Sequence, residues 1–255
     1  MRVIIIGAGR GRRLMPTTAD TPKCFAEVEG RRILDWVLDA FRANGLDRFC
    51  FIGGYRMDVV RREYPEFEFR ENTAWEHNNI LESLFYAEDL MDEPYMCCYS
   101  DVLFNKHIVA GLLANDDDIA LAIDTGWLAR YEARTEHPSD DAEKVTVDSG
   151  VVTRVHRGIP EPEAYGEYIG LARFSAAGAA GLREHYHRCR REFAGRPWRE
   201  AKVFEKAYKI HLFQEMIEAG QRMVHVDTPG GYIEVDTQQD FEYARQYWTS
   251  RHLDC

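Results

Sequence analysis

The chain has 255 residues, 45% of them hydrophobic and 12% aromatic, so it can bury a sizeable core and is not a disordered protein. Its formal net charge of −11 disfavours nucleic acid and anionic membranes as main partners, although local arginines can still bind a small anion. Its six cysteines form no C-x-x-C pair, and no apolar run is long enough for a signal peptide or a membrane span, which together predict a cytoplasmic protein with reduced thiols.

The first half of the chain alternates short apolar runs with amphipathic segments. The predicted strands are 3–6, 48–55, 67–73, 94–104 and 118–124. The predicted helices between them are 33–45, 58–64, 79–91 and 106–115. This alternation predicts a parallel sheet with helices on both of its faces.

The pattern changes after residue 125. Residues 144–158 predict a hairpin that turns at Asp148-Ser149-Gly150. Two amphipathic helices, 176–193 and 201–220, precede a strand at 223–228 and a C-terminal helix. We therefore expect one Rossmann-like α/β domain, 1–255, with a mostly parallel (mixed) central sheet and a helical subregion near 176–220 that is a candidate lid or dimer face.

A glycine-rich turn, GAGRG, follows the first strand directly. Such turns bring backbone N–H groups close to phosphate oxygens. The dinucleotide fingerprint G-x-G-x-x-G fails in both registers, because Arg12 or Leu14 stands at its last glycine. The ATPase loop fails as well, because no Gly-Lys-Ser or Gly-Lys-Thr follows. A dinucleotide-dependent oxidoreductase is therefore disfavoured.

The residues after these glycines carry a longer pattern, which runs from Ala8 through Gly9, Gly11, Arg13, Leu14 and Pro16 to Pro22-Lys23. It resembles the opening signature of the nucleotidyltransferases that join a nucleoside triphosphate to a sugar phosphate, phosphocholine or a phosphonate, A-G-x-G-x-R-[LM]-x-P-x-T-x-x-x-P-K. Gly7 departs from that family, which usually has alanine there.

The resemblance implies a role for each matching residue. Gly7, Ala8, Gly9 and Gly11 would bind the nucleotide phosphates through the backbone. Arg13 and Lys23 would be catalytic, since they place two cations where charge builds on the leaving pyrophosphate.

Carboxylates at two distant places in the chain predict a metal site. Asp101 follows an apolar strand, at the edge where open α/β sheets place their sites. Glu234 and Asp236 alternate with Val235 and so share one face of a late strand. Mg²⁺ prefers such oxygen ligands. The resemblance implies that Asp101 and Asp236 hold Mg²⁺ as cofactor and that Glu234 supports them.

The nucleoside is expected against two further segments. Gly54 and Tyr55 end the second strand, and the spacing Asn78, Asn79, Ser83, Leu84 resembles phosphocholine and phosphonate cytidylyltransferases. The resemblance implies that the nucleotide, CTP, contacts a set comprising Gly54, Tyr55, Asn79, Ser83 and Ser100. Asn79 is equally a candidate helix N-cap.

The acceptor is expected against Trp127, Arg130, Tyr131, Arg134 and Glu167. An aromatic cage of Trp127, Tyr131 and Tyr165 with Glu167 would suit a quaternary ammonium. Arginine forks from Arg130 and Arg134 would suit a small phosphonate instead. The W-x-x-x-Y-x-x-R run resembles phosphonate cytidylyltransferases, which favours the phosphonate. His137 is expected to be an ordinary loop histidine.

These observations predict an Mg²⁺-dependent cytidylyltransferase that transfers CMP from CTP to a small phosphonate and releases pyrophosphate. Candidate acceptors are 2-aminoethylphosphonate, 2-hydroxyethylphosphonate and phosphonoformate. The alternatives are a phosphocholine cytidylyltransferase and a sugar-1-phosphate nucleotidylyltransferase. A non-catalytic nucleotide sensor is disfavoured, because the charged residues of the site are all present. A homodimer is left open.

Overall fold

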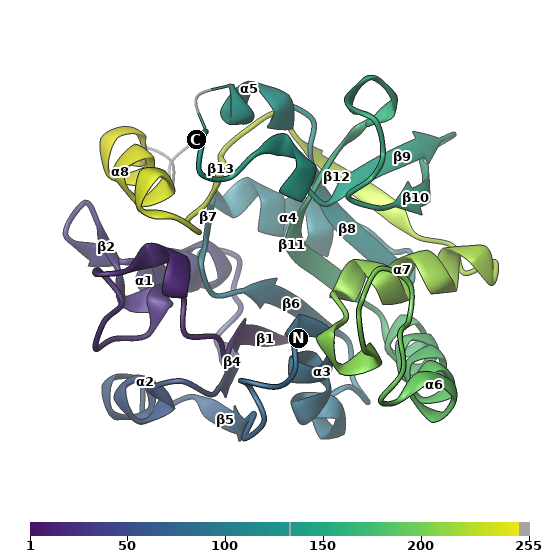
Figure 1. The fold of residues 1–255 in the computed structure, drawn as a ribbon, viewed down its shortest axis with the longest axis horizontal. Coiled ribbons are helices and arrows are strands. Elements are labelled where there is room, and N and C mark those ends of the chain that lie inside the picture. Colours follow the sequence, from purple (N-terminus) through teal and green to yellow (C-terminus); the bar gives the residue numbers. More distant parts are fainter. Residues whose placement is uncertain (133, 250–255) are drawn as a thin grey trace.

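A nine-stranded mixed sheet forms the centre of the molecule, in the order β5-β4-β1-β6-β11-β8-β12-β10-β9 (Figure 1). A computed structural model describes residues 1–132 and 134–249. The strands of this sheet are β1 (Arg2–Gly7), β4 (Arg48–Gly53), β5 (Glu68–Glu71), β6 (Tyr95–Tyr99), β8 (Ile119–Asp124), β9 (Lys144–Asp148), β10 (Val151–Val155), β11 (Gly166–Phe174) and β12 (Val224–Thr228). Strands β5, β4, β1 and β6 run parallel, and β11 lies antiparallel between β6 and β8.

Helices cover both faces of the sheet because successive residues of a strand point to opposite faces. Val3 and Ile5 belong to a core with α1, α2 and α4, whereas Ile4 and Ile6 belong to a core with α3, α6 and α7. The helices are α1 (Ile33–Arg42), α2 (Met57–Glu63), α3 (Ile80–Leu84), α4 (Lys106–Leu113), α5 (Trp127–Tyr131), α6 (Ala176–Phe193), α7 (Lys209–Glu218) and α8 (Gln238–Tyr247). None that the described ranges contain is long and apolar enough to cross a membrane.

Two small sheets lie beside the central one. Strand β2 (Glu27–Val28) pairs with β3 (Arg31–Arg32), and β7 (Val102–Phe104) pairs with β13 (Tyr232–Glu234). In the second pair Glu234 lies opposite Val102, and the Val235 N–H donates to the Asp101 carbonyl at 2.9 Å. This pairing brings the C-terminal segment against the end of β6.

The hairpin and most predicted elements are confirmed, but the strand 94–104 is wrong as one unit. Strand β6 ends where the Ser100 N–H donates to the Ile6 carbonyl, and residues 102–104 then leave the central sheet to pair with β13. The central antiparallel strand β11 was not expected as a strand. Its insertion between β6 and β8, with the antiparallel strands β10 and β9 at one edge, makes the sheet mixed.

Two predicted helices are shorter than expected. The segment 79–91 is α3 followed by a 3-10 helix, Phe85–Leu90, with non-helical backbone at Ala87. Within 201–220 only a 3-10 turn, Phe204–Lys206, and α7 are helical. The carbonyls of Glu205 and Ala207 accept hydrogen bonds from the start of α3 instead, which keeps residues 205–207 out of α7. The helical subregion 176–220 is therefore two helices with an irregular connection.

Candidate active site

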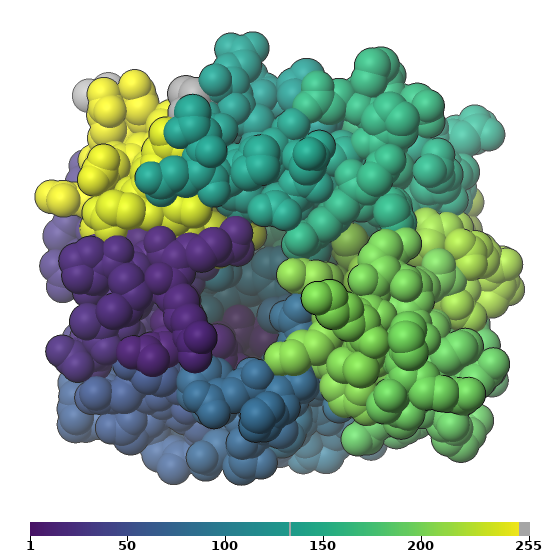
Figure 2. Space-filling view, in the orientation of Figure 1, coloured from purple at the N-terminus to yellow at the C-terminus, as the bar shows by residue number. Residues whose placement is uncertain are grey.

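A cavity of about 550 Å³ opens beside the carboxyl ends of β1 and β6. Figure 2 shows it as a hollow between the purple N-terminal segment and the light-green segment before α7. The residues that line it come from stretches spread along the chain and include Gly7, Ala8, Gly9, Gly11, Arg13, Lys23, Trp75, Asn78, Asn79, Ser83, Tyr99, Ser100, Asp101, His137, Asp141, Glu143, Arg157, Glu167, Tyr168, Tyr208, Tyr232, Glu234 and Asp236. The volume lies in the range usual for small-molecule sites.

The glycine-rich loop needs its glycines for close packing. Gly11 has φ of 67°, a left-handed conformation that side chains rarely adopt, and a Cβ built there would lie 3.0 Å from the Cβ of Lys23. At Gly7 a Cβ would lie 2.5 Å from the Phe51 ring and 2.7 Å from the Ser100 hydroxyl. Glycine at position 7 therefore lets this loop approach β4 and the end of β6.

Lys23 joins the two aspartates that the sequence places far apart. Its Nζ atom donates to Asp101 Oδ2 at 2.6 Å and to Asp236 Oδ1, and only 8% of the residue is exposed. Burial by itself would lower the pKa of Lys23, but the charges of the two aspartates outweigh it and raise that pKa. The ammonium group is therefore held charged between the carboxylates.

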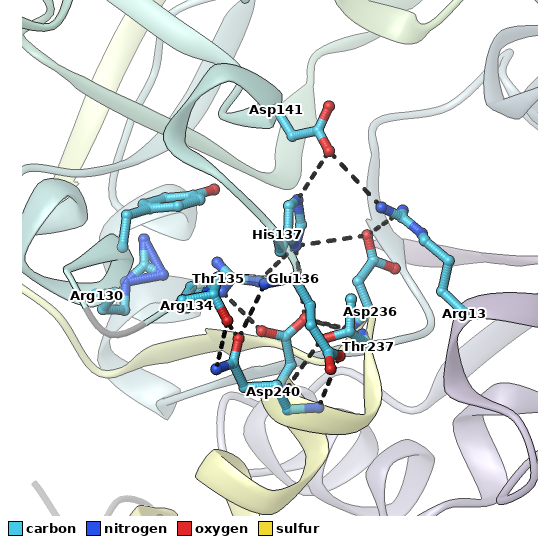
Figure 3. A network of polar contacts seen from close by, with 12 residues as sticks. Arg13, Arg130, Arg134, Thr135, Glu136, His137, Asp141, Asp236, Thr237 and Asp240 are labelled. Atoms are coloured by element: carbon cyan, nitrogen blue, oxygen red, sulfur yellow. Dashed lines mark hydrogen bonds and ion pairs between the residues drawn. The ribbon is translucent and has the colours of Figure 1, made fainter.

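Asp236 has a second cationic partner. Arg13 Nη2 lies 2.6 Å from Asp236 Oδ2, and Arg13 Nη1 lies 3.7 Å from Asp141 Oδ2 (Figure 3). Burial would raise the pKa of Asp236, but the charges of Lys23 and Arg13 lower it to about 2. Asp236 is thus ionised at neutral pH and ready to accept a cation.

Glu234 and His137 complete the acidic end of the cavity. Burial, followed by the charges of Asp236 and Asp101, raises the pKa of Glu234 well above its usual value. Ligand atoms of His137, Glu234 and Asp236 lie within 4.8 Å of one another. Figure 3 shows the His137 ring directed toward Asp236 and Asp141. The carboxylates of Glu234 and Asp236 together with His137 could hold a divalent cation here.

The loop that carries His137 is fastened to the start of α8. Arg134 Nε donates to Asp240 Oδ1 at 2.7 Å, and Arg134 Nη2 donates to His137 Nδ1 at 2.6 Å. Thr135 N also donates to the Gln239 side chain at 2.8 Å. Thr237 caps α8 through a capping box with Asp240, so the helix end and the loop share one carboxylate.

A second part of the cavity wall is formed by residues in or next to β6, β9, β10, β11 and α7. It carries the rings of Tyr99, Tyr168 and Tyr208 together with Glu143 and Arg157. Tyr99 donates to Glu143 Oε2 at 3.2 Å, and the Arg157 guanidinium lies 4.1 Å from the centre of the Tyr208 ring. This wall combines aromatic faces with one charge of each sign.

An amide network lines the side near α3. Asn72 Nδ2 donates to Ser83 Oγ and to Asn78 Oδ1, each at 2.8 Å. Asn79 is the N-cap of α3, because its side chain accepts from the Ile80 N–H. Ser83 and Asn78 therefore face the cavity as fixed polar groups.

Comparison with known proteins identifies the domain that surrounds this cavity. A family model described as the MobA-like NTP transferase domain matches residues 3–188, which is most of the chain and includes the glycine-rich loop and Asp101. The chain belongs to the MobA-like NTP transferase family. It is therefore a nucleotidyltransferase with the α/β fold of that family.

Two similar proteins act on small phosphorus-containing acceptors. A CTP:phosphoglutamine cytidylyltransferase of Campylobacter jejuni is 27% identical over 95% of this chain and 98% of its own. A 2-aminoethylphosphonate cytidylyltransferase of Lancefieldella rimae is 25% identical over 72% of this chain and 71% of its own.

Solved structures share the whole fold. The inositol-1-phosphate CTP transferase of T. maritima superimposes with a TM-score of 0.73 at 19% identity, over 100% of this chain and 98% of that one. The CTP:phosphocholine cytidylyltransferase of Streptococcus pneumoniae superimposes with a TM-score of 0.72 at 16% identity, over 97% of this chain and 99% of that one. The likeness therefore extends beyond the matched family domain to the C-terminal segment that carries Asp236.

Within this NTP transferase, the predicted nucleotide residues fall into two groups. Gly7, Ala8, Gly9, Gly11, Asn79, Ser83 and Ser100 line the cavity. Gly54 and Tyr55 are not among the described lining residues. The Tyr55 N–H donates to the Ala8 carbonyl at 3.0 Å, and its hydroxyl donates to the Ala19 carbonyl at 2.8 Å. They brace the glycine-rich loop from behind.

Most of the predicted acceptor residues are likewise not among the described residues that line the cavity. Glu167 alone of that set is among the described residues that line the cavity. It accepts from Arg130 and from the Tyr131 hydroxyl, each at 2.6 Å. Trp127 packs against Tyr131 in a small separate core.

The predicted cage and arginine forks are therefore not assembled in the cavity. Tyr165 is exposed, and its hydroxyl donates to Asp227. Arg130 pairs with Asp124 and Glu167, and Arg134 pairs with Asp240, so both guanidinium groups bind the protein itself. The expectation of an ordinary loop histidine was also too simple, since His137 is buried and lines the cavity.

Sequence reasoning missed several lining residues. They include Trp75, Tyr99, Glu143, Arg157, Tyr168 and Tyr208. Tyr99 precedes Ser100 at the end of β6, which was a signal that could have been used. Glu143 stands in the run A-E-K-V, which resembles phosphonate cytidylyltransferases and was a further usable signal. Arg157 and Tyr208 stand in segments without a motif, and only tertiary packing brings them to the cavity.

Proposed function

We propose that the protein is a cytidylyltransferase that transfers CMP from CTP to a small phosphorylated or phosphonate acceptor and releases pyrophosphate. The observation that carries the proposal is that one cavity contains the glycine-rich loop, Lys23 and Arg13 together with the carboxylates of Asp101 and Asp236. The choice of CTP is supported by the names of the two cytidylyltransferases that resemble this chain.

The reaction needs no covalent enzyme intermediate. An anionic oxygen of the acceptor attacks the α-phosphorus of CTP and forms the new P–O bond. The bond from that phosphorus to the oxygen bridging to the β-phosphorus breaks, and pyrophosphate leaves with the electron pair. Because the acceptor oxygen is already anionic, His137 is not required as a general base.

The protein's own part is to bind and neutralise. Backbone N–H groups of the glycine-rich loop would hold phosphate oxygens, and Arg13 and Lys23 would stabilise the charge that grows on pyrophosphate. Ser83, Asn78 and Ser100 offer fixed polar groups to the nucleoside. Positioning and charge stabilisation are then the main sources of rate.

Mg²⁺ fits the donor set of the acidic end. Asp101 and Asp236 would hold the ion, and Glu234 would support them, since hard oxygen ligands suit it. When bound, the ion would neutralise phosphate charge and polarise the α-phosphate. Asp101 and Asp236 both pair with Lys23 in this structure. A bound cation would take over part of the charge neutralisation that Lys23 provides.

The test is pyrophosphate release from each of CTP, UTP, ATP and GTP with Mg²⁺ and a panel of acceptors. The panel contains phosphoglutamine, 2-aminoethylphosphonate, phosphocholine and glucose 1-phosphate. We expect release with CTP and at least one of the first three acceptors. Release only with glucose 1-phosphate would favour the sugar branch, and nucleotide binding without release from any pair would overturn the proposal.

A further inference from the structure

The charged side chains of the cavity differ in how fully they are paired. Glu167 accepts two hydrogen bonds at 2.6 Å, and Lys23 bridges two aspartates. Glu143 and Arg157 are held more loosely. Arg157 Nη2 lies 3.7 Å from Glu143 Oε1, and its Nη1 lies 3.4 Å from Asp141 Oδ1. These distances are too long for strong charge-assisted hydrogen bonds.

Both groups are nevertheless fixed in place. Glu143 is 7% exposed, and the Tyr99 hydroxyl orients its carboxylate. The Arg157 guanidinium lies against the Tyr208 ring, and its Nε atom is buried without a hydrogen-bond partner among the described residues. Both residues line the cavity, and the long contacts of the two Arg157 Nη atoms and of Glu143 Oε1 leave these atoms free to form stronger hydrogen bonds with a ligand.

The combination of charges distinguishes between acceptor classes. An acceptor with an ammonium group alone would suit Glu143 and the tyrosine rings but would be repelled by Arg157. An acceptor with a carboxylate alone would suit Arg157 but would be repelled by Glu143. The hydroxyls of an uncharged sugar could hydrogen-bond to both groups but would balance neither charge. Only a ligand end that carries both charges gives each side chain a charge-assisted hydrogen bond.

We infer that Glu143 and Arg157 form a subsite for an α-amino acid group at the end of the acceptor remote from its phosphorus. The ammonium would bind Glu143, and the carboxylate would bind Arg157 as a bidentate partner. This inference rests on the proposed function and deepens it by naming the acceptor class, a phosphorylated or phosphono amino acid. Arg157 and Glu143 are then specificity-determining residues that touch the acceptor.

The test uses acceptors that differ by one charged group on the same skeleton. 2-Amino-4-phosphonobutyrate carries both groups, 3-aminopropylphosphonate lacks the carboxylate, and 4-phosphonobutyrate lacks the ammonium. Phosphoglutamine and its decarboxylated and deaminated counterparts form a longer set. Dissociation constants are measured with Mg²⁺ and a CTP analogue that has a methylene α,β-bridge, and kcat/KM is measured with CTP.

We expect the amino acid of at least one set to be preferred over both of its counterparts by about 10-fold or more, as one charge-assisted hydrogen bond to each group would give. In Arg157→Met the preference for the carboxylate should vanish while the preference for the ammonium remains. In Glu143→Gln the preference for the ammonium should vanish while the preference for the carboxylate remains. Arg154→Met changes an exposed arginine on β10, three residues before Arg157, that is not among the described lining residues, and it should leave both ratios unchanged.

Several outcomes would overturn the subsite. They are the absence of any preference for the amino acid in both sets, and an equal loss for all acceptors in Arg157→Met, which would place the acceptor phosphorus group at Arg157. The proposed function fails separately. If binding follows the predicted ratios but no pyrophosphate is released, the subsite stands and the transferase activity does not.

Discussion

Lys23 Nζ lies 2.6 Å from Oδ2 of Asp101, although the two residues are 78 positions apart in the chain. The same ammonium group also reaches Asp236. The cation that would stabilise the leaving pyrophosphate therefore rests, without ligand, between the carboxylates that would hold the metal. This relationship links catalysis, metal binding and stability at one atom.

Replacing Lys23 by alanine should lower kcat by ~100-fold or more, the loss typical of removing one preorganised charge-stabilising group. The variant should also be less stable without metal, because Asp101 and Asp236 lose their shared buried cation. Mg²⁺ should then raise the melting temperature of Lys23→Ala more than that of the wild type. Calorimetry with and without Mg²⁺ checks this, and an equal rise in both proteins would contradict the shared site.

Asparagine at position 101 or 236 should abolish pyrophosphate release while the fold and part of the CTP affinity remain. The amide keeps the shape of the side chain but removes the charge that a hard cation requires. Asp141→Asn is a matched control, because Asp141 lines the same cavity but is not assigned to the metal. Asp141→Asn should retain more activity than Asp101→Asn or Asp236→Asn. Steady-state rates of the three variants over a range of Mg²⁺ concentrations test this ranking.

Gly11→Ala should destabilise the protein by about 1–2 kcal/mol, the cost of forcing a residue with a side chain into the left-handed region. The new Cβ would also press on the Lys23 side chain, so kcat should fall. Gly9→Ala is the control for stability, because a Cβ at Gly9 meets nothing within 4 Å. Urea unfolding of the two variants decides the point, and equal destabilisation would show that the strain at Gly11 is not the cause.

The stabilisation by Asp240 should depend on pH in the acidic range. Burial opposes ionisation, but the adjacent His137 ring and the hydrogen bond from Arg134 hold the pKa of Asp240 well below its usual range. A carboxyl with a lowered pKa in the folded state stabilises fully above its unfolded pKa of about 3.9 and loses this as the pH falls further. The difference in unfolding free energy between wild type and Asp240→Asn should therefore shrink as the pH falls below about 4, and it should go on shrinking toward the lowered pKa of the folded state. An unfolding free-energy difference that stays constant over this pH range would contradict an ionised pair of Asp240 and Arg134.

Arg134 should act through position and not through contact with the acceptor. Its guanidinium already donates hydrogen bonds to Asp240 and His137. Arg134→Leu should lower the melting temperature, as the loss of one partner of a buried pair does. Adding Asp240→Asn should recover part of that loss. If Arg134→Leu instead raised KM for the acceptor with unchanged stability, a direct binding role would be indicated.

The sequence by itself determined the elements that depend on local pattern. The buried run before the glycines, the positive-φ turn at Ser149-Gly150 and the alternation of strands and helices follow from residue periodicity and turn chemistry. The sequence also singled out Arg13, Lys23, Asp101 and Asp236, since each stands at a fixed place in a motif or at the end of an apolar strand. Each of these predictions depends only on residues that lie close together in the sequence.

Tertiary structure decided what depends on partners far away in the chain. Glu143 and Arg157 reach the cavity because β9 pairs with both β11 and β10, and Tyr208 reaches it from the start of α7. Arg130 and Arg134 look like ligand-binding arginines in the sequence, yet buried carboxylates at positions 124, 167 and 240 pair with them first. Whether a paired charge lines the cavity, as Lys23 does, or lies away from it, as Arg130 and Arg134 do, depends on distances between segments that are far apart in the sequence. These distances exist only in three dimensions.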